Sequence, residues 1–248
     1  MLPTVDVRGL PITACCMDDV RLILADAISG VTGTCRIATI NLSFLRQADA
    51  RPEVRAALQT FEHRLADGWP VLELARLAGT PLPERVTGAS LVPAILGWAR
   101  AEGWKIALVG GLPETRTALA KDGRWDDVIC GHWMPEYRDE QAVHDPAICA
   151  AIRAAGADIV LVALGCPKQE LWLNANLAAC GADVGLGIGG SLEFLAGIRS
   201  RAPLWVQWLR CEFLYRMLQE PRRLGGRYYA DWCYWRQVRG MAQAAGAG

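Results

Sequence analysis

Lysine is scarce in this 248-residue chain, because only Lys105, Lys121 and Lys168 are present and arginine carries nearly all of the positive charge. The 26 basic residues balance 26 acidic ones, which argues against a protein that coats nucleic acid. Long hydrophobic runs are also missing. The longest charge-free stretch, Val86–Ala99, is too short to span a bilayer of about 30 Å. We therefore predict that no transmembrane helix is present and that nucleic acid is not a partner.

Several signatures of catalysis and redox chemistry are missing as well. The chain has no HExxH, and no two aspartates stand two residues apart, so we expect no metal site of either type. It has no GxSxG hydrolase elbow, no GxxxxGK[ST] loop and no complete GxGxxG fingerprint. The nine cysteines form no CxxC pair, and the first residues do not resemble a signal peptide. We therefore expect reduced thiols and a cytoplasmic location.

Strand and helix patterns alternate along the chain. We expect a hairpin at 4–7 and 12–15, a helix from 18 to about 29, and β-branched strands at 36–41 and 71–75. Further on, buried strands at 104–109, 127–130, 158–165 and 183–188 alternate with helices at 91–101, 113–121, 146–155 and 167–179. This alternation predicts an α/β fold: a Rossmann-like, mostly parallel sheet flanked by helices, with an N-terminal hairpin region.

The composition changes after about residue 199. Between 199 and 239, nine arginines face three acids, and four of the ten tryptophans and four of the five tyrosines lie there. We therefore expect a catalytic domain at 1–198 and a basic, aromatic helical appendage at 199–248 that associates with a membrane. In a helical 227–239 segment, Tyr228, Trp232, Trp235 and Arg239 would share one stripe. Such a stripe suits either the headgroup layer of a membrane or the protein's own core.

Glycine-rich turns follow three of the expected strands. They contain Gly110 and Gly111, then Gly165 and Lys168, and then Gly189 and Gly190. In open parallel sheets ligands bind beyond the carboxyl ends of the strands, where backbone amides and helix N-termini favour a diphosphate. Lys168 is either a phosphate ligand at such a turn or an exposed residue of the first helical turn.

A second candidate site comes earlier in the chain. Thr39 and Asn41 place polar side chains on one face at the end of an expected strand. Asp67 and Gly68 stand in a loop beside Trp69, a setting that can raise the pKa of an acid and fit it for general-base catalysis. The alternative is an ordinary Asp-Gly turn.

These elements, in this order, resemble a known family. They are Thr39-x-Asn41, Ala66-Asp67-Gly68, Glu84-Arg85-Val86-x-Gly88, Gly110-Gly111, Gly165-x-Pro167-Lys168-Gln169-Glu170, Gly189-Gly190, Arg201-Ala202-Pro203 and Glu212-x-x-Tyr215-Arg216. From about residue 36 to 228 the chain resembles the WecG/TagA/CpsF glycosyltransferases. The resemblance implies inverting transfer of a sugar from a UDP-sugar to a polyprenyl-diphosphate-linked saccharide, without a metal or other cofactor, in the synthesis of cell-envelope polymers.

The resemblance also assigns roles to individual residues. Asp67 matches the catalytic base, and Arg85 and Gln169 match residues around the donor. Thr39 and Asn41 match polar pocket residues, and Glu193, in Leu192-Glu193, stands where the family commonly has Phe-Asp. The arginines expected against membrane and leaving diphosphate are Arg216, Arg222, Arg223 and Arg227.

We therefore expect a glycosyltransferase on the inner face of the plasma membrane. The donor sugar stays open between an N-acetylmannosamine type, its uronic acid and glucose, and a homo-oligomer also stays open. Two alternatives remain: a non-catalytic nucleotide-sugar-binding subunit of a polysaccharide assembly complex, and an NAD-dependent Rossmann-like oxidoreductase. The missing GxGxxG weakens the oxidoreductase.

Overall fold

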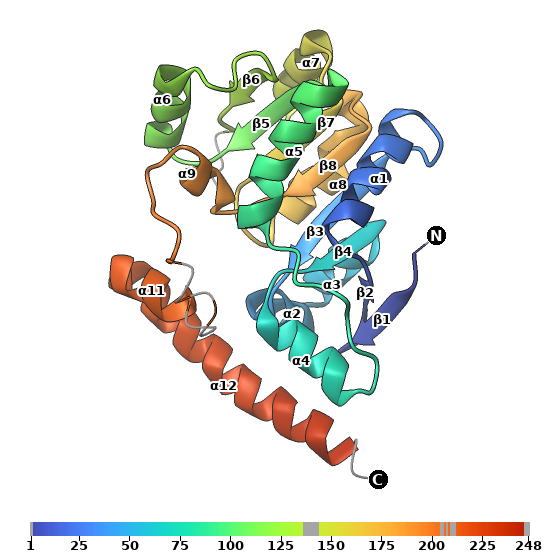
Figure 1. Ribbon diagram of the computed structural model, residues 1–248, viewed down its shortest axis with the longest axis vertical. Helices are drawn as coiled ribbons and strands as arrows, with labels where there is room; N and C mark the ends of the chain where they lie inside the picture. The colour runs from blue at the N-terminus through green and yellow to red at the C-terminus, as the bar shows by residue number, and fades with distance from the viewer. Residues whose placement is uncertain (1, 136–143, 204–205, 207, 209–211, 246–248) are drawn as a thin grey trace.

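The computed structural model describes residues 2–135, 144–203, 206, 208 and 212–245 (Figure 1). Six strands form one parallel sheet in the order β4-β3-β8-β7-β5-β6. They are β3 (Cys35–Ile40), β4 (His63–Ala66), β5 (Ile106–Gly110), β6 (Ile129–Trp133), β7 (Ile159–Ala163) and β8 (Val184–Gly187). The expected Rossmann-like α/β fold is confirmed.

Helices cover both faces of the sheet. One face carries α1 (Met17–Ile28), α5 (Gly88–Glu102), α6 (Pro113–Asp122) and α9 (Ser191–Leu195). The other carries α2 (Leu42–Ala50), α3 (Pro52–Gln59), α4 (Trp69–Leu77), α7 (Pro146–Ala155), α8 (Lys168–Cys180) and the antiparallel hairpin of β1 (Thr4–Val7) and β2 (Leu10–Thr13). Neighbouring residues of one strand, such as Val160 and Leu161, enter different cores. The central strands are therefore apolar on both faces, which explains their continuous hydrophobic runs.

The strand expected at 71–75 is wrong, because these residues lie within helix α4. An apolar run of this length fits a strand or a buried helix equally well by periodicity alone. Gly68 is the N-cap and Pro70 stands in the first turn, where its fixed φ suits a helix start. The strand next to β3 is instead β4, which ends just before Asp67. Asp67 therefore follows a strand rather than preceding one.

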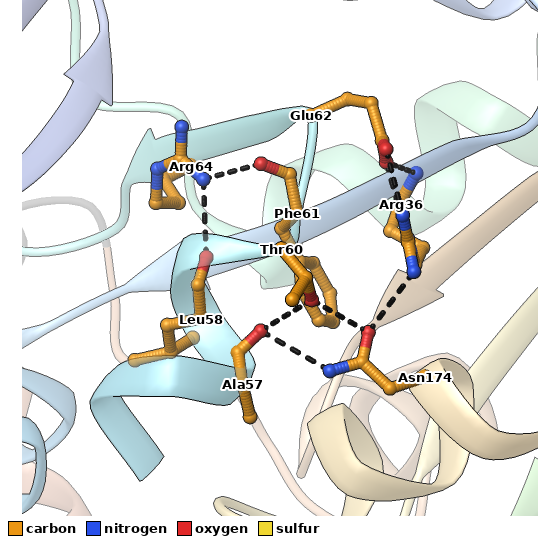
Figure 2. A network of polar contacts seen from close by, with 8 residues as sticks. All are labelled: Arg36, Ala57, Leu58, Thr60, Phe61, Glu62, Arg64 and Asn174. Carbon is orange, nitrogen blue, oxygen red and sulfur yellow. Dashed lines mark hydrogen bonds and ion pairs between the residues drawn. The ribbon is translucent and has the colours of Figure 1, made fainter. Parts of the chain in front are cut away.

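A polar network secures the amino-terminal ends of β3 and β4 (Figure 2). The Arg36 guanidinium donates to both carboxylate oxygens of Glu62 and to Asn174 Oδ1 on α8. The hydroxyl of Thr60 also donates to Asn174 Oδ1, at 2.8 Å. Buried Arg64 donates to backbone carbonyl groups of Leu58 and Phe61. These contacts hold the amino-terminal ends of the two strands. The loops that can contact a ligand lie at the opposite, carboxyl-terminal edge of the sheet.

Two C-terminal helices complete the described chain, α11 (Glu212–Gln219) and α12 (Pro221–Ala245). α12 packs along the outside of α2 and α4 (Figure 1). Two polar contacts hold it to α2: Arg46 Nε lies 2.7 Å from Asp231 Oδ1, and the Tyr234 hydroxyl donates to Asp49 Oδ2 at 2.7 Å. Among the described residues, no helix combines the length and the apolar character needed to cross a membrane.

The aromatic side chains of α12 are only partly packed against the protein. Trp235 packs edge to face on Trp69 of α4, with ring centroids 5.0 Å apart. Trp232 is 52% exposed, and its neighbour Tyr229 is 69% exposed. The helix therefore uses one side to join the core and keeps aromatic surface on the other.

Candidate active site

The candidate residues from distant parts of the chain gather at one edge of the sheet. Asn41 follows β3, Asp67 follows β4, Gly111 follows β5, Gly165 follows β7 and Gly189 follows β8. Because all six strands are parallel, their carboxyl ends share this edge, and it is where open α/β sheets bind ligands.

Asp67 has an unusual electrostatic environment. Its backbone N–H donates to Ile40 O at 2.8 Å, so the end of β3 fixes its position. Desolvation raises the pKa of Asp67 to about 7, against the opposing charges of Arg85 and Arg216 and a hydrogen bond from the Gly88 backbone. A carboxylate with a pKa near neutrality exists in both protonation states at working pH, which is what a general base requires.

The two arginines reach this acid from different segments. Arg85 lies in the loop before α5, and its Nη1 is 3.4 Å from Glu212 Oε2 at the start of α11. Arg216 lies one turn further along α11, and its Nη2 is 3.3 Å from the place a Cβ on Gly190 would occupy. The C-terminal helices thus bring a cation between Asp67 and the glycine turn after β8.

Glu193 also lies close to that turn. Its side chain is 7% exposed, and its Oε2 has no hydrogen-bond partner among the described residues. The same oxygen lies 3.3 Å from the Cβ position of Gly190, as the guanidinium of Arg216 does. An acceptor and a donor group therefore flank one backbone turn.

Gln169 contacts the same turn through a hydrogen bond to its backbone. It is buried; its Oε1 accepts the Gly189 N–H at 3.0 Å, and its Nε2 donates to Glu170 Oε1 at 2.7 Å. Desolvation raises the pKa of fully buried Glu170 to about 8. A Cβ on Gly187 would lie 2.6 Å from Gln169 Nε2, so any side chain at this strand position would displace Gln169. The contacts of Gln169 are thus made with the protein, and they position the turn.

Thr39 and Asn41 lie at the end of β3 and make polar contacts there. The buried Thr39 hydroxyl donates to Gly187 O at 3.4 Å. Asn41 Oδ1 caps α2 by accepting the N–H groups of Ser43 and Phe44. Both side chains tie neighbouring elements to the sheet edge.

The other two glycine turns adopt left-handed backbone conformations. Gly110 and Gly111 have φ values of +86° and +87°, and Gly165 has +76°, a region that side chains rarely tolerate. His132 Nε2 lies 2.7 Å from Gly110 O and holds the first turn against β6. Lys168, half-buried, is the first residue of α8.

The remaining appendage arginines lie elsewhere. Arg222 and Arg227 are exposed on α12, where the Arg227 guanidinium is 5.1 Å from the centre of the Tyr228 ring. The side chain of Arg223 lies outside what the structure describes. The described arginines that act on the Asp67 carboxyl are Arg85 and Arg216.

The sequence marks the motif that contains Gln169, but it indicates no separate role for Glu170. Its burial and its bond to Gln169 arise only when α8 packs against β8. Its place beside Gln169 in the chain was the only available signal. Among the described residues, no three His, Cys, Asp or Glu side chains gather as ligands for a metal ion.

Fold and site together define a Rossmann-like α/β protein with glycine turns, two arginines and a carboxyl of raised pKa at the carboxyl edge of its sheet. Comparison with known families identifies it further. The chain belongs to the glycosyl transferase WecG/TagA/CpsF family, whose family model matches residues 5–244. The resemblance found in the sequence is thereby confirmed. Membership implies glycosyltransferase activity in cell-wall polysaccharide synthesis, which supports a transferase.

Proposed function

We propose that this protein moves a hexose-type sugar from a UDP-sugar to a polyprenyl-diphosphate-linked saccharide, with inversion and without a metal ion. The observation that carries the proposal is the Asp67 carboxyl, whose pKa lies at about 7 between two arginines. The donor remains one of three: an N-acetylmannosamine type, its uronic acid, or glucose.

In the proposed reaction the Asp67 carboxylate takes the proton of the acceptor hydroxyl. The freed oxygen forms a bond to the anomeric carbon while the bond from that carbon to the β-phosphate oxygen breaks. A single displacement of this kind inverts the anomeric centre. The departing UDP carries the negative charge, which the guanidinium groups of Arg216 and Arg85 stabilise in the proposed reaction.

The test is a donor screen with a lipid-diphosphate-linked saccharide as acceptor, following UDP release with and without a chelator. Asp67→Asn should lower turnover by about 10²–10⁴-fold, the usual contribution of a general base. Asp127→Asn is the matched control, because Asp127 is exposed and paired with Arg100 outside the site. A fully active Asp67→Asn protein contradicts the assignment, and chelator-sensitive turnover contradicts the metal-free mechanism. UDP binding without transfer indicates a non-catalytic subunit.

We also propose that residues 199–248 act as a membrane-associating appendage, so that the protein sits peripherally on the inner face of the plasma membrane. The exposed apolar residues Phe213, Leu214 and Leu218 lie on α11, and exposed Trp232 lies on α12. Arginines such as Arg222 accompany them, and aromatic and basic side chains together suit an anionic lipid surface.

Flotation with vesicles that contain anionic lipid tests this second proposal on the full chain. Leu214→Glu combined with Leu218→Glu should abolish most of the flotation, because both changed positions are exposed on α11. Leu22→Glu, at an exposed apolar position of α1, should float like the unchanged protein. Equal flotation of all three proteins would rule out α11 as the docking element.

A further inference from the structure

A hollow of about 400 Å³ opens directly beside the candidate active site. Apolar side chains form most of its wall: Trp69 and Leu72 from α4, Leu82 from the following loop, and Trp208 from the segment before α11. Arg76 and Arg85 also line the hollow. The hollow thus joins a helix of the main body to the C-terminal segment.

This hollow, here called the Trp69–Trp208 groove, is continuous with the reacting end of the site. Arg85 belongs to both, because it lines the groove and acts on the Asp67 carboxyl. Trp69 stands two residues after Asp67 and is held in place by edge-to-face packing on Trp235. A ligand in the groove therefore has one end next to the proposed base.

The charges of the groove are uneven along its length. Arg76 is neutralised within α4 by Glu73, at 2.8 Å, so the rim carries little net charge. Arg85 makes only a longer contact with Glu212, at 3.4 Å. The groove therefore combines an apolar wall with one cation, Arg85, that also acts on the proposed base.

The wall also includes apolar surface that the fold leaves uncovered. Trp208 is 83% exposed, the highest value among the exposed large hydrophobic residues of the described chain. Trp208 is not isolated, because it lines the groove together with Trp69 and Leu72, and contiguous apolar surface is typical of ligand-binding grooves. A volume of about 400 Å³ lies within the usual range for small-molecule sites, about 300–1,000 Å³.

We propose that the Trp69–Trp208 groove binds the first isoprenoid units of the lipid-linked acceptor and so directs its saccharide past Arg85 toward Asp67. The inference rests on the proposed function, because it names where one part of that substrate lies. The groove has room for only the start of a long polyprenyl chain, so the rest of the chain stays in the bilayer. The protein thereby recognises the lipid as well as the sugar of its acceptor.

The experiment compares two acceptors that carry the same saccharide and diphosphate but different lipids, a methyl group or a farnesyl group. Both are used in solution, without vesicles or detergent and below the concentration at which farnesyl forms micelles. For the unchanged protein, kcat/KM should be at least about tenfold higher with farnesyl, because burying each additional apolar carbon is favourable. Equal values for the two acceptors overturn the proposal.

Variants of the groove test whether it is the source of the preference for the farnesyl acceptor. Trp208→Ser removes an exposed side chain, so folding is preserved, and the farnesyl preference should fall to about threefold or less, with little change for the methyl acceptor. Leu72→Asn should act in the same direction from the opposite wall. Val31→Ser, at an exposed apolar position outside the groove, should keep the full preference. A preference that survives in both groove variants overturns the proposal.

A binding measurement separates this inference from the proposed function. Tryptophan fluorescence is titrated with farnesyl diphosphate and, separately, with methyl diphosphate, with no sugar donor present. Tighter binding of farnesyl diphosphate that is lost in Trp208→Ser supports the groove even where no sugar transfer is found. Equal affinities for the two diphosphates overturn the groove, whatever the outcome of the transfer assay.

Discussion

The pKa of Asp67 makes a quantitative prediction about catalysis. With a pKa of about 7, roughly one tenth of the protein carries the carboxylate at pH 6 and roughly one hundredth at pH 5. Because the base acts as the carboxylate, log kcat/KM should rise with a slope of one up to about pH 7 and then level off. The assay is UDP release measured from pH 5 to 9 at low substrate concentration.

The rising part of this pH profile, here called the acid limb, lies at a pH that the neighbouring charges set. Arg85 lowers the pKa of Asp67, so Arg85→Gln should move the limb to higher pH. Glu170→Gln is the control, since Glu170 is another buried acid of the site with a raised pKa, and its change should leave the acid limb in place. A limb near pH 4, or one that persists in the residual activity of Asp67→Asn, would refute the reasoning.

The same shift affects stability in a defined direction. The folded protein keeps the Asp67 proton up to about pH 7, whereas the unfolded chain releases it near pH 3.8. The folded state therefore binds more protons between these values, and stability from this group is lost as the pH rises through that window. Asp67→Asn, which stays neutral, should unfold at a higher urea concentration than the unchanged protein at pH 8. The difference should vanish below about pH 4.

Two further predictions concern the packing that positions the site. Gly187→Ala should lower the free energy of unfolding by about 1–3 kcal/mol in urea, because its Cβ meets Gln169 Nε2, while Gly97→Ala, which meets nothing within 4 Å, should not. Equal stability of the two variants would show that the turn adapts. Tyr234→Phe should cost about 0.5–1.5 kcal/mol through its lost hydrogen bond to Asp49, and Tyr229→Phe, exposed on the same helix, should cost nothing measurable. An unchanged free energy of unfolding in Tyr234→Phe would show that apolar packing alone holds α12.

The sequence predicts the central sheet well because its strands are buried on both faces. The runs that became β5, β7 and β8 are continuous and apolar, and helices separate them. β4 gave no such signal, since its four residues include a charged Arg64 whose guanidinium is satisfied by backbone carbonyl groups. The sequence predicts a strand where helix α4 lies, because the four apolar residues among 71–75 are too few to reveal a period.

The candidate site was predictable where single residues carry the signal. Asp67 and the glycine turns were found because family motifs and backbone requirements mark them in the chain. Glu170 was not, because its raised pKa comes from burial under α8. The reach of Arg216 toward Asp67 is likewise a product of tertiary packing, which no local pattern in the chain encodes.

The docking of α12 on α2 and α4 has a consequence for how the protein is made. Asp67 leaves the ribosome long before Arg216, so the growing chain carries its acid without one of the two cations that offset it. The contacts of Asp231 with Arg46 and of Tyr234 with Asp49 form only after Asp231 and Tyr234 have been synthesised. Helix α11 is thus synthesised after the acid on which its Arg216 acts, and a chain interrupted before Arg216 lacks that part of the charge balance.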